Sequence, residues 1–283
     1  MAGKTCLVTG ATNGIGYETA LGLARAGARV GLVGRDGGRA ERAASDIRAS
    51  VPGAVTDVFV ADLSSQSEIR RLAAEVRKTY PRLDVVVNNA GAIFDRREET
   101  VDGIERTWAL DHLGYVLLSL ELLDLLKASA PSRIVNVSSA AHARETVDFD
   151  DLEGRKKFSA IKAYSQAKLG NVLFTKALAR RLEGTGVTVN ALHPGVINTG
   201  FAKNTGGLLG FAWGLLRPFL KAPSQGAATS LFLATSPTVE GVSGRYFSRS
   251  AELPSSEVSR DEGVQERVWE ISLRQVGRPS ASL

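Results

Sequence analysis

The sequence predicts an α/β protein with a doubly wound parallel sheet of about seven strands and helices on both faces. Short runs of Val, Ile, Leu and Ala alternate with longer segments of helical period, and this β-α-β order with right-handed crossovers yields a parallel sheet. The short runs are nearly continuously apolar, as strands are when helices cover both of their faces. The 283 residues suffice for one sizeable core, so we expect residues 1–283 to form a single domain.

The expected elements follow one another along the chain. The strand candidates are residues 5–10, 29–34, 56–61, 84–88, 133–138, 187–192 and 244–248. The helix candidates repeat apolar residues at helical spacing and are residues 15–26, 38–49, 65–79, 101–126, 163–182 and 225–234. A polar tail from about residue 249 to 283 is expected to run over the surface and then form a short amphipathic helix near 264–276.

The charge pattern argues against a nucleic-acid partner. A formal net charge of +5 invites that interpretation. The basic residues are scattered, however, and only Arg155, Lys156 and Lys157 form a tight run. Short charge runs are usually solvated surface, so we expect no nucleic acid to bind.

Cysteine usage and the first residues indicate a cytoplasmic protein. Cys6 is the single cysteine, so no intramolecular disulfide can form and a reducing compartment fits. A strand-like run begins at Thr5, which leads us to expect neither a secretory signal nor an anchor. The most apolar later stretch, 206–220, is interrupted by Arg217 and Pro218, and we expect no membrane span.

A glycine-rich turn connects the first strand to the first helix. Glycines permit a tight turn and let backbone N–H groups approach a pyrophosphate, while the N-terminus of the following helix favours an anion. The position between a strand and an amphipathic helix strengthens this interpretation over that of a plain turn. The candidate cofactor-binding residues of this turn are Gly10, Thr12, Asn13, Gly14, Ile15 and Gly16.

The end of the second strand favours NADP(H). An acid at this point binds the ribose 2′-hydroxyl of NAD, whereas an arginine suits a 2′-phosphate. Gly34 occupies the place where the acid would be expected, and Arg35 follows it. Asp36 could still be a ribose ligand, and Arg35 could be an ordinary surface residue. The planar fork of Arg35 can pair with a phosphate, so the sequence predicts NADP(H).

Two further strand ends are candidates for cofactor contacts because they lie beside the point where the strand order reverses. Asp62 and Leu63 close the third strand, and the Asp62 carboxylate could meet the adenine edge. Asn89, Ala90 and Gly91 close the fourth, where small residues leave room for a nucleoside to pack against the backbone.

Several ordered motifs together resemble the short-chain dehydrogenase/reductase family over nearly the whole chain, from Thr5 to about Phe247. They are Thr9-x-x-x-Gly14-x-Gly16, Asn88-Asn89-Ala90-Gly91, Ser139, Tyr164-x-x-x-Lys168 and Pro194-Gly195-x-x-x-Thr199. The resemblance implies a Rossmann fold and hydride transfer between a nicotinamide and a carbonyl or alcohol. It also implies that Thr199, after Pro194, Gly195 and Val196, contacts the nicotinamide carboxamide.

The chemistry of the candidate catalytic residues also follows from their spacing. Tyr164 and Lys168 stand four apart on an expected helix, so their side chains share one face. An ammonium at ~4 Å attracts a phenolate by up to ~4 kcal/mol at an effective dielectric of about 20, which could lower the tyrosine pKa by roughly 3 units. Tyr164 is then the proton donor and Ser139 polarises the carbonyl oxygen. By resemblance, Tyr164 and Lys168 also contact the cofactor and Lys168 holds the nicotinamide ribose.

Asp111 departs from the resembled family, which usually has at this position an Asn that supports a water relay to the lysine. If the relay uses the backbone carbonyl, Asp111 retains it. A carboxylate near Lys168 could instead trap the ammonium and weaken its effect on Tyr164. That second alternative includes a cofactor-binding pseudoenzyme or regulator with weak or no turnover.

The histidines predict no metal site. His112 and His142 lie far apart and show no metal-ligand spacing, and His193 is expected to be packed at a strand end. The adjacent Ser138 is expected to point to the side opposite Ser139, because side chains alternate along a strand.

The segment between Ser139 and Tyr164 is longer than in compact family members, and it resembles that of the retinol dehydrogenase-like branch. An apolar segment at 201–221, within a substrate loop expected at about 200–223, suits a lipophilic aldehyde or ketone. An ordinary core helix and shallow docking on a membrane surface are the alternatives. Without an expected anchor, a retinoid substrate is in doubt. The long helices at 101–126 and 163–182 allow a homodimer or homotetramer, although their charged residues also allow a monomer.

Overall fold

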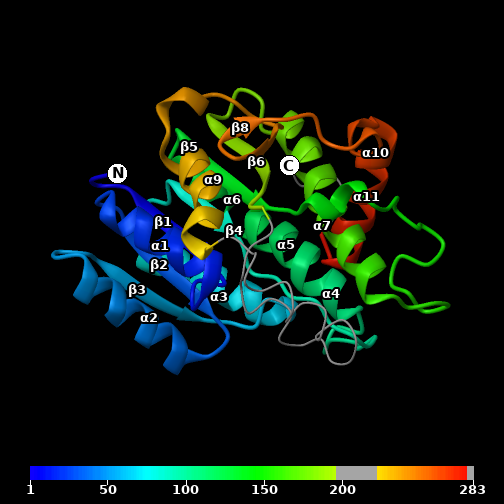
Figure 1. The fold of residues 1–283 in the computed structure, drawn as a ribbon, viewed down its shortest axis with the longest axis horizontal. Helices are drawn as coiled ribbons and strands as arrows, with labels where there is room; N and C mark the ends of the chain where they lie inside the picture. Colours follow the sequence, from blue (N-terminus) through cyan, green and yellow to red (C-terminus); the bar gives the residue numbers. More distant parts are fainter. Residues whose placement is uncertain (196–221, 279–283) are drawn as a thin grey trace.

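A computed structural model describes residues 1–195 and 222–278. Its sheet has the strand order β3-β2-β1-β4-β5-β6-β7-β8 (Figure 1), and all neighbours are parallel except β7 and β8. The strands are β1 Thr5–Thr9, β2 Arg29–Gly34, β3 Thr56–Val60, β4 Val85–Asn88, β5 Ser132–Val137, β6 Val187–His193, β7 Tyr246–Ser248 and β8 Ala251–Glu252. The order reverses between β1 and β4, as in a doubly wound sheet, so the predicted fold class is confirmed.

Helices cover both faces of this sheet (Figure 1). Those in the described residues are α1 Gly14–Arg25, α2 Gly37–Ser50, α3 Gln66–Thr79, α4 Arg106–Trp108, α5 Gly114–Glu121, α6 Leu123–Ala128, α7 Ala160–Arg181, α9 Pro223–Thr235, α10 Glu257–Arg260 and α11 Glu262–Gln275. The predicted elements agree with these to within a few residues at most ends, because alternating β and α periodicities are strong signals.

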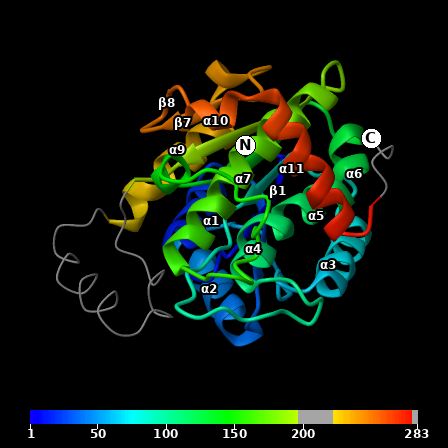
Figure 2. The same cartoon turned by 90° about the vertical axis from the view of Figure 1, so that its right-hand side faces the viewer.

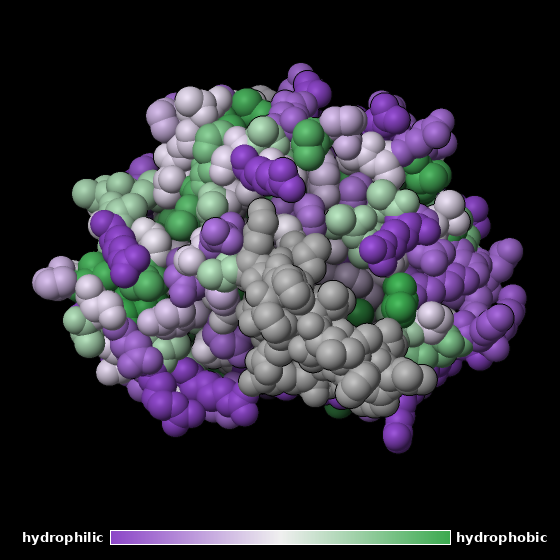
Figure 3. Space-filling model, in the orientation of Figure 1, coloured by the Kyte–Doolittle hydropathy of each residue, from purple (hydrophilic) through white to green (hydrophobic). Residues whose placement is uncertain are grey.

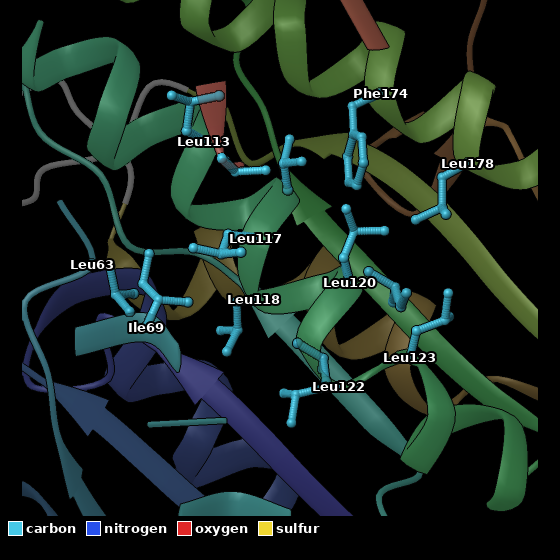
Figure 4. Close-up of a cluster of buried hydrophobic side chains, with 14 of the residues drawn as sticks. Leu63, Ile69, Leu113, Leu117, Leu118, Leu120, Leu122, Leu123, Phe174 and Leu178 are labelled. Carbon is cyan, nitrogen blue, oxygen red and sulfur yellow. The ribbon is translucent and has the colours of Figure 1, made fainter. Parts of the chain in front are cut away.

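Two apolar clusters form the core, one on each face. Adjacent residues of β1 point to opposite faces, so Leu7 packs in the cluster with α3, α5, α7 and α11, while Cys6 and Val8 pack in the cluster with α1, α2 and α9. Figure 4 shows part of the first cluster, where Phe174 and Leu178 of α7 point toward leucines of the α5–α6 region. Burial on both faces explains the nearly continuous apolar runs of the strands.

The predicted helix at 101–126 is not continuous. Its start is fixed by Glu105, whose buried carboxylate accepts hydrogen bonds from the N–H groups of Thr107 and Trp108, both at 2.8 Å. A π-helical turn, Ala109–Leu113, then separates α4 from α5. Such single-turn widenings often occur at functional sites, and this one carries Asp111.

The C-terminal tail contains a strand that the sequence did not predict and a helix that it did. Strand β8, which the sequence analysis missed, pairs with β7 through a turn in which Arg249 and Ser250 have φ of 51° and 58°. Helix α11 agrees with the amphipathic helix predicted near 264–276, and it lies along α7 (Figure 2). Trp269 stacks on Phe174 with ring centroids 5.6 Å apart, and Glu266 pairs with Arg180 at 2.7 Å.

The surface carries hydrophilic residues round the margin of the face drawn in Figure 3. In the described part of the chain, no helix has both the length and the apolar character needed to cross a membrane.

Candidate active site

A cavity of about 640 Å³ opens at the carboxyl ends of the parallel strands. The loops after β1 to β6 and the first turns of α7 contribute its walls. The predicted site residues that line it are Gly10, Thr12, Asn13, Gly14, Ile15, Gly16, Arg35, Asp62, Leu63, Asn89, Ala90, Gly91, Ser139, Tyr164, Lys168, Pro194 and Gly195. Val196, Thr199 and the segment 201–221 lie outside the described residues.

The glycine-rich turn forms a cradle that side chains would fill. Gly10 has a φ of 65°, and a Cβ there would lie 2.8 Å from the Cα of Ala90. A Cβ on Gly16 would lie 2.2 Å from the carbonyl oxygen of Gly10. The Asn89 side chain holds the turn by donating to the Thr9 carbonyl at 2.8 Å. Asn13 makes no side-chain cap hydrogen bond, so the first N–H groups of α1 remain available to an anion.

The end of β2 has no acid, and Gly34 packs against the glycine-rich turn. A Cβ on Gly34 would lie 2.5 Å from Cγ2 of Thr12, so a side chain at this position would require the Thr12 side chain to move. Asp36 instead caps α2, because its carboxylate accepts from the Arg39 N–H at 2.9 Å and lies 3.6 Å from the Arg39 guanidinium. Arg35 and Arg39 both line the cavity. Sequence reasoning missed Arg39, although its position three residues after a helix N-cap places it at the same mouth.

Asp62 is oriented by the turn that follows β3. Its Oδ1 accepts hydrogen bonds from the N–H of Ser64 at 2.9 Å and from the Ser64 hydroxyl at 2.7 Å. Leu63 and Ser64 line the cavity beside it.

Ser139, Tyr164 and Lys168 meet at the deeper end of the cavity. Tyr164 and Lys168 share one face of α7, with the Lys168 Nζ 5.5 Å from the centre of the Tyr164 ring. Ser139 follows β5 and is hydrogen-bonded to Tyr164. Both neighbouring serines touch the cavity, but the Ser138 hydroxyl donates to the Lys168 carbonyl at 2.7 Å and ties α7 to β5. That arrangement supports Ser139 as the candidate reactive serine.

Asp111 lies behind this group and does not line the cavity. Its Oδ2 is 3.2 Å from Lys168 Nζ, and both side chains are almost completely buried. Its Oδ1 accepts from the Ala92 N–H at 2.9 Å, and its backbone carbonyl accepts from the Asn171 amide at 2.8 Å. The absence of a side chain at Gly91 leaves room, since a Cβ there would lie 2.9 Å from Oδ2. The Asp111 carboxylate therefore pairs with the Lys168 ammonium, as one of the two alternatives for Asp111 expects.

The electrostatics of the group differ from the sequence expectation. Burial raises the pKa of Tyr164, the Asp111 carboxylate raises it further, and the hydrogen bond with Ser139 opposes both. Burial likewise raises the pKa of Asp111, against the attraction of Lys168. The prediction that the Tyr164 pKa is lowered was wrong in direction, because burial disfavours the phenolate and the Asp111 carboxylate beside Lys168 repels it.

His112 and His142 are buried and hydrogen-bonded within the fold, whereas His193 lines the cavity. Burial lowers the pKa of His112 to about 3, and its ring contacts the Ser272 hydroxyl at 2.8 Å. His142 shows no metal-ligand spacing in the sequence, and in the structure its Nε2 accepts a hydrogen bond from the Ser256 N–H at 3.1 Å. Its Nδ1, which must then carry the proton, donates to the Ser139 carbonyl at 2.7 Å. It thus fixes the backbone of the candidate reactive serine. The described residues contain no cluster of three or more His, Cys, Asp or Glu that could hold a metal.

The mouth beyond Ser139 and Tyr164 combines apolar and cationic residues. Its apolar lining comprises Ile93, Leu110, Ala141, Ala160 and Ile161. Arg106 and Arg144 also line it, and sequence reasoning missed both. Nothing in their local sequence marks them, since only the fold brings these two segments to one cavity.

The fold and this cavity define the class of dinucleotide-binding oxidoreductases with a Ser–Tyr–Lys group. A family model described as short chain dehydrogenase matches residues 4–207. The chain belongs to the short-chain dehydrogenase family, whose members of this type act on alcohols or carbonyls.

Individual relatives support a retinol dehydrogenase-like assignment. The chain is 43% identical to mouse retinol dehydrogenase 12 over 275 residues, and this alignment covers 97% of the chain and 87% of the mouse protein. It is 43% identical over 290 residues to human retinol dehydrogenase 13, with coverage of 99% and 87%. Among solved structures, the Pseudomonas aeruginosa RhlG/NADP active-site complex matches with a TM-score of 0.71 and 27% identity, covering 94% of this chain and 97% of that one.

Proposed function

We propose that this protein is an NADP(H)-dependent reductase of lipophilic aldehydes or ketones. The observation that carries the proposal is one cavity that joins an open helix N-terminus and two arginines to the group Ser139, Tyr164 and Lys168. Phosphates favour the first end of such a cavity, and proton transfer to a carbonyl oxygen requires the second.

The cofactor fits the residues present. The glycine cradle and the free N–H groups of α1 would hold the pyrophosphate. Arg35 and Arg39 would bind a 2′-phosphate, while the carboxylate of Asp36 is already engaged in capping α2. The structural relative bound to NADP supports this preference over NAD. Asp62, Asn89, Ala90 and the Pro194–Gly195 turn complete the proposed binding surface, and we retain Val196 and Thr199 as proposed contacts.

When bound, the reduced cofactor supplies the hydride chemistry. Tyr164 holds the proton at Oη and gives it to the carbonyl oxygen, while Ser139 donates a hydrogen bond that stabilises the charge developing there. Lys168 orients the ribose by donating from Nζ. Burial and the Asp111 carboxylate both raise the pKa of Tyr164, so Tyr164 remains a neutral phenol that can act as an acid. The protonated phenol is the form that carbonyl reduction requires.

A lipophilic substrate is supported by the apolar mouth and by the named activity of the relatives. Ile161, at the N-terminal turn of α7, is 43% exposed and lines the cavity. An exposed isoleucine at such a place gains free energy when an apolar ligand covers it, at about 25 cal/mol per Å². The cytoplasmic location stays a prediction, and the choice between a homodimer, a homotetramer and a monomer stays as open as the sequence leaves it.

The test is oxidation of NADPH, and separately NADH, with aldehydes of increasing chain length. We expect turnover with NADPH, rising kcat/KM with chain length, and loss of turnover in Tyr164→Phe. A flat response to chain length would contradict the lipophilic substrate. Tight NADPH binding without turnover of any aldehyde would overturn the proposal in favour of a cofactor-binding regulator.

A further inference from the structure

We propose that the substrate carries a carboxylate as well as its aldehyde or ketone, and that Arg144 binds this carboxylate at the mouth of the cavity. The inference rests on the proposed function, because it concerns the substrate end of the same cavity. It changes the expected substrate from a purely apolar molecule to an oxo acid with an apolar body.

Arg144 has a fixed position relative to the reacting group. It ends the 3₁₀ turn Ala140–Ala143 that begins at Ser139, and its N–H donates to the Ala141 carbonyl at 3.0 Å. Further hydrogen bonds hold the turn, from the Ala141 N–H to Ser139 Oγ at 3.2 Å and from the His142 N–H and Nδ1 to the Ser139 carbonyl at 3.1 and 2.7 Å. At a rise of about 2 Å per residue, the Cα of Arg144 lies on the order of 10 Å from that of Ser139.

The charge of Arg144 is uncompensated within the described residues, where its guanidinium makes no ion pair, hydrogen bond or ring contact. Arg106, the other cation of the mouth, pairs with Glu98 and lies 4.4 Å above the ring of Phe94. The sequences 196–221 and 279–283 contain no Asp or Glu that could neutralise Arg144.

Acidic residues of the cavity lie at its other end. Among the described lining residues these are Asp36 and Asp62, which follow β2 and β3 and are held by their own turns. The cofactor phosphates are already provided for by α1, Arg35 and Arg39. Arg144 lines the same cavity five residues after Ser139 and shares the mouth with apolar residues such as Ile161, so it suits an anion on a largely apolar substrate.

The chemistry and the span define the ligand class. A guanidinium matches a carboxylate through its planar fork. Because Arg144 is five residues beyond Ser139, the carboxylate must be separated from the reacting carbonyl by several bonds. Aromatic aldehydes with a para carboxylate and medium-chain ω-oxo acids meet this requirement, whereas 2-oxo acids do not.

The experiment compares each acid with its methyl ester, which differs only in charge at the distal group. The probes are 4-formylbenzoate and 9-oxononanoate with their methyl esters, at saturating NADPH. We expect kcat/KM to be about tenfold higher for the better acid than for its ester. Arg144→Met should reduce this ratio about five- to tenfold, and high salt should reduce it in the wild type. Arg96→Met is the matched control, because Arg96 is also exposed but does not line the cavity, and it should leave the ratio unchanged.

Equilibrium binding of the same pairs to the NADP⁺-loaded protein separates this inference from the proposed function. Turnover of the esters with no preference for either acid, and no change of ratio in Arg144→Met, would overturn the carboxylate site and leave the reductase intact. Arg144-dependent binding of an acid without turnover of any probe would retain the site and overturn the reductase. Failure of every probe to bind would overturn both.

Discussion

Replacing Asp111 with Asn tests the central electrostatic feature of the site. The buried carboxylate lies 3.2 Å from Lys168 Nζ and compensates its charge. An amide at this position retains an oxygen that can accept from the Ala92 N–H, now bonded at 2.9 Å. The substitution therefore removes the negative charge with little change in shape, and it leaves the ammonium of Lys168 free to act on Tyr164.

The magnitude follows from the separation of Lys168 and Tyr164. At the 5.5 Å between Nζ and the ring centre, an effective dielectric of about 20 gives an attraction of ~3 kcal/mol for the phenolate, or about 2 pKa units. Loss of the repulsion between the carboxylate and the phenolate acts in the same direction. Burial of the free ammonium opposes it, so we expect the Tyr164 pKa to fall by about 1 to 2 units.

The assay is the pH dependence of carbonyl reduction with NADPH. Reduction needs protonated Tyr164, so kcat/KM falls as the pH rises through its pKa. In the wild type a raised pKa keeps the phenol protonated to higher pH. In Asp111→Asn the falling limb should move to lower pH by about 1 to 2 units, and alcohol oxidation should begin at correspondingly lower pH. The ring of Tyr115 lies 5.2 Å from Lys168 Nζ, but its pKa is raised well above its usual value and it stays neutral.

The control is Asp148→Asn, which removes a carboxylate paired with Lys162 at 2.6 Å on the surface. It should leave the pH profile of kcat/KM unchanged. If the fall of kcat/KM with pH in Asp111→Asn stays in place or moves to higher pH, with an unaltered melting temperature, the compensation of Lys168 by Asp111 is refuted.

Three further predictions concern the cofactor, stability and assembly. In steady-state kinetics, Arg39→Ala should raise KM for NADPH by about tenfold and leave KM for NADH unchanged, because only NADPH has a 2′-phosphate with which Arg39 can pair. An equal effect on both cofactors would exclude this contact. Trp269→Ala should lower the free energy of unfolding in urea by about 3–5 kcal/mol, since the indole is buried against Phe174; a loss below about 1 kcal/mol would show that α11 contributes little to the core. We expect sedimentation to show that no dimer forms through α5 and α7, because α11 already lies along α7 and residues 114–120 are all buried within one chain. A dimer that charged substitutions on α7 abolish would contradict this expectation.

Much of the fold follows from periodicity, which single sequences carry strongly. Strands buried on both faces and amphipathic helices leave patterns that do not depend on distant residues. The break between α4 and α5 does depend on them, because the carboxylate of Glu105 caps α4 and the carbonyl of Asp111 is bonded to Asn171. Strand β8 is only two residues long, too short for any period.

The candidate site divides in the same way. Glycines and the Tyr–Lys pair are recognisable because their roles depend on backbone shape and on spacing along one helix. Arg106 and Arg144 have no such pattern, and only the folded chain brings them to the cavity. Their assignment required knowing which other charges lie nearby, and that information is distributed over the whole sequence.

The sign of the Tyr164 pKa shift illustrates this limit most directly. A lysine four residues away on the same helix predicts a lowered pKa, and that argument is correct for two isolated side chains. The π-helical turn places Asp111 against the same ammonium, and the missing side chain of Gly91 makes room for it. Burial of the phenol and the nearby Asp111 carboxylate together reverse the expected direction of the pKa shift. Neither the depth of the tyrosine nor the position of the carboxylate follows from the spacing of Tyr164 and Lys168, so the sign of this shift had to come from the folded chain.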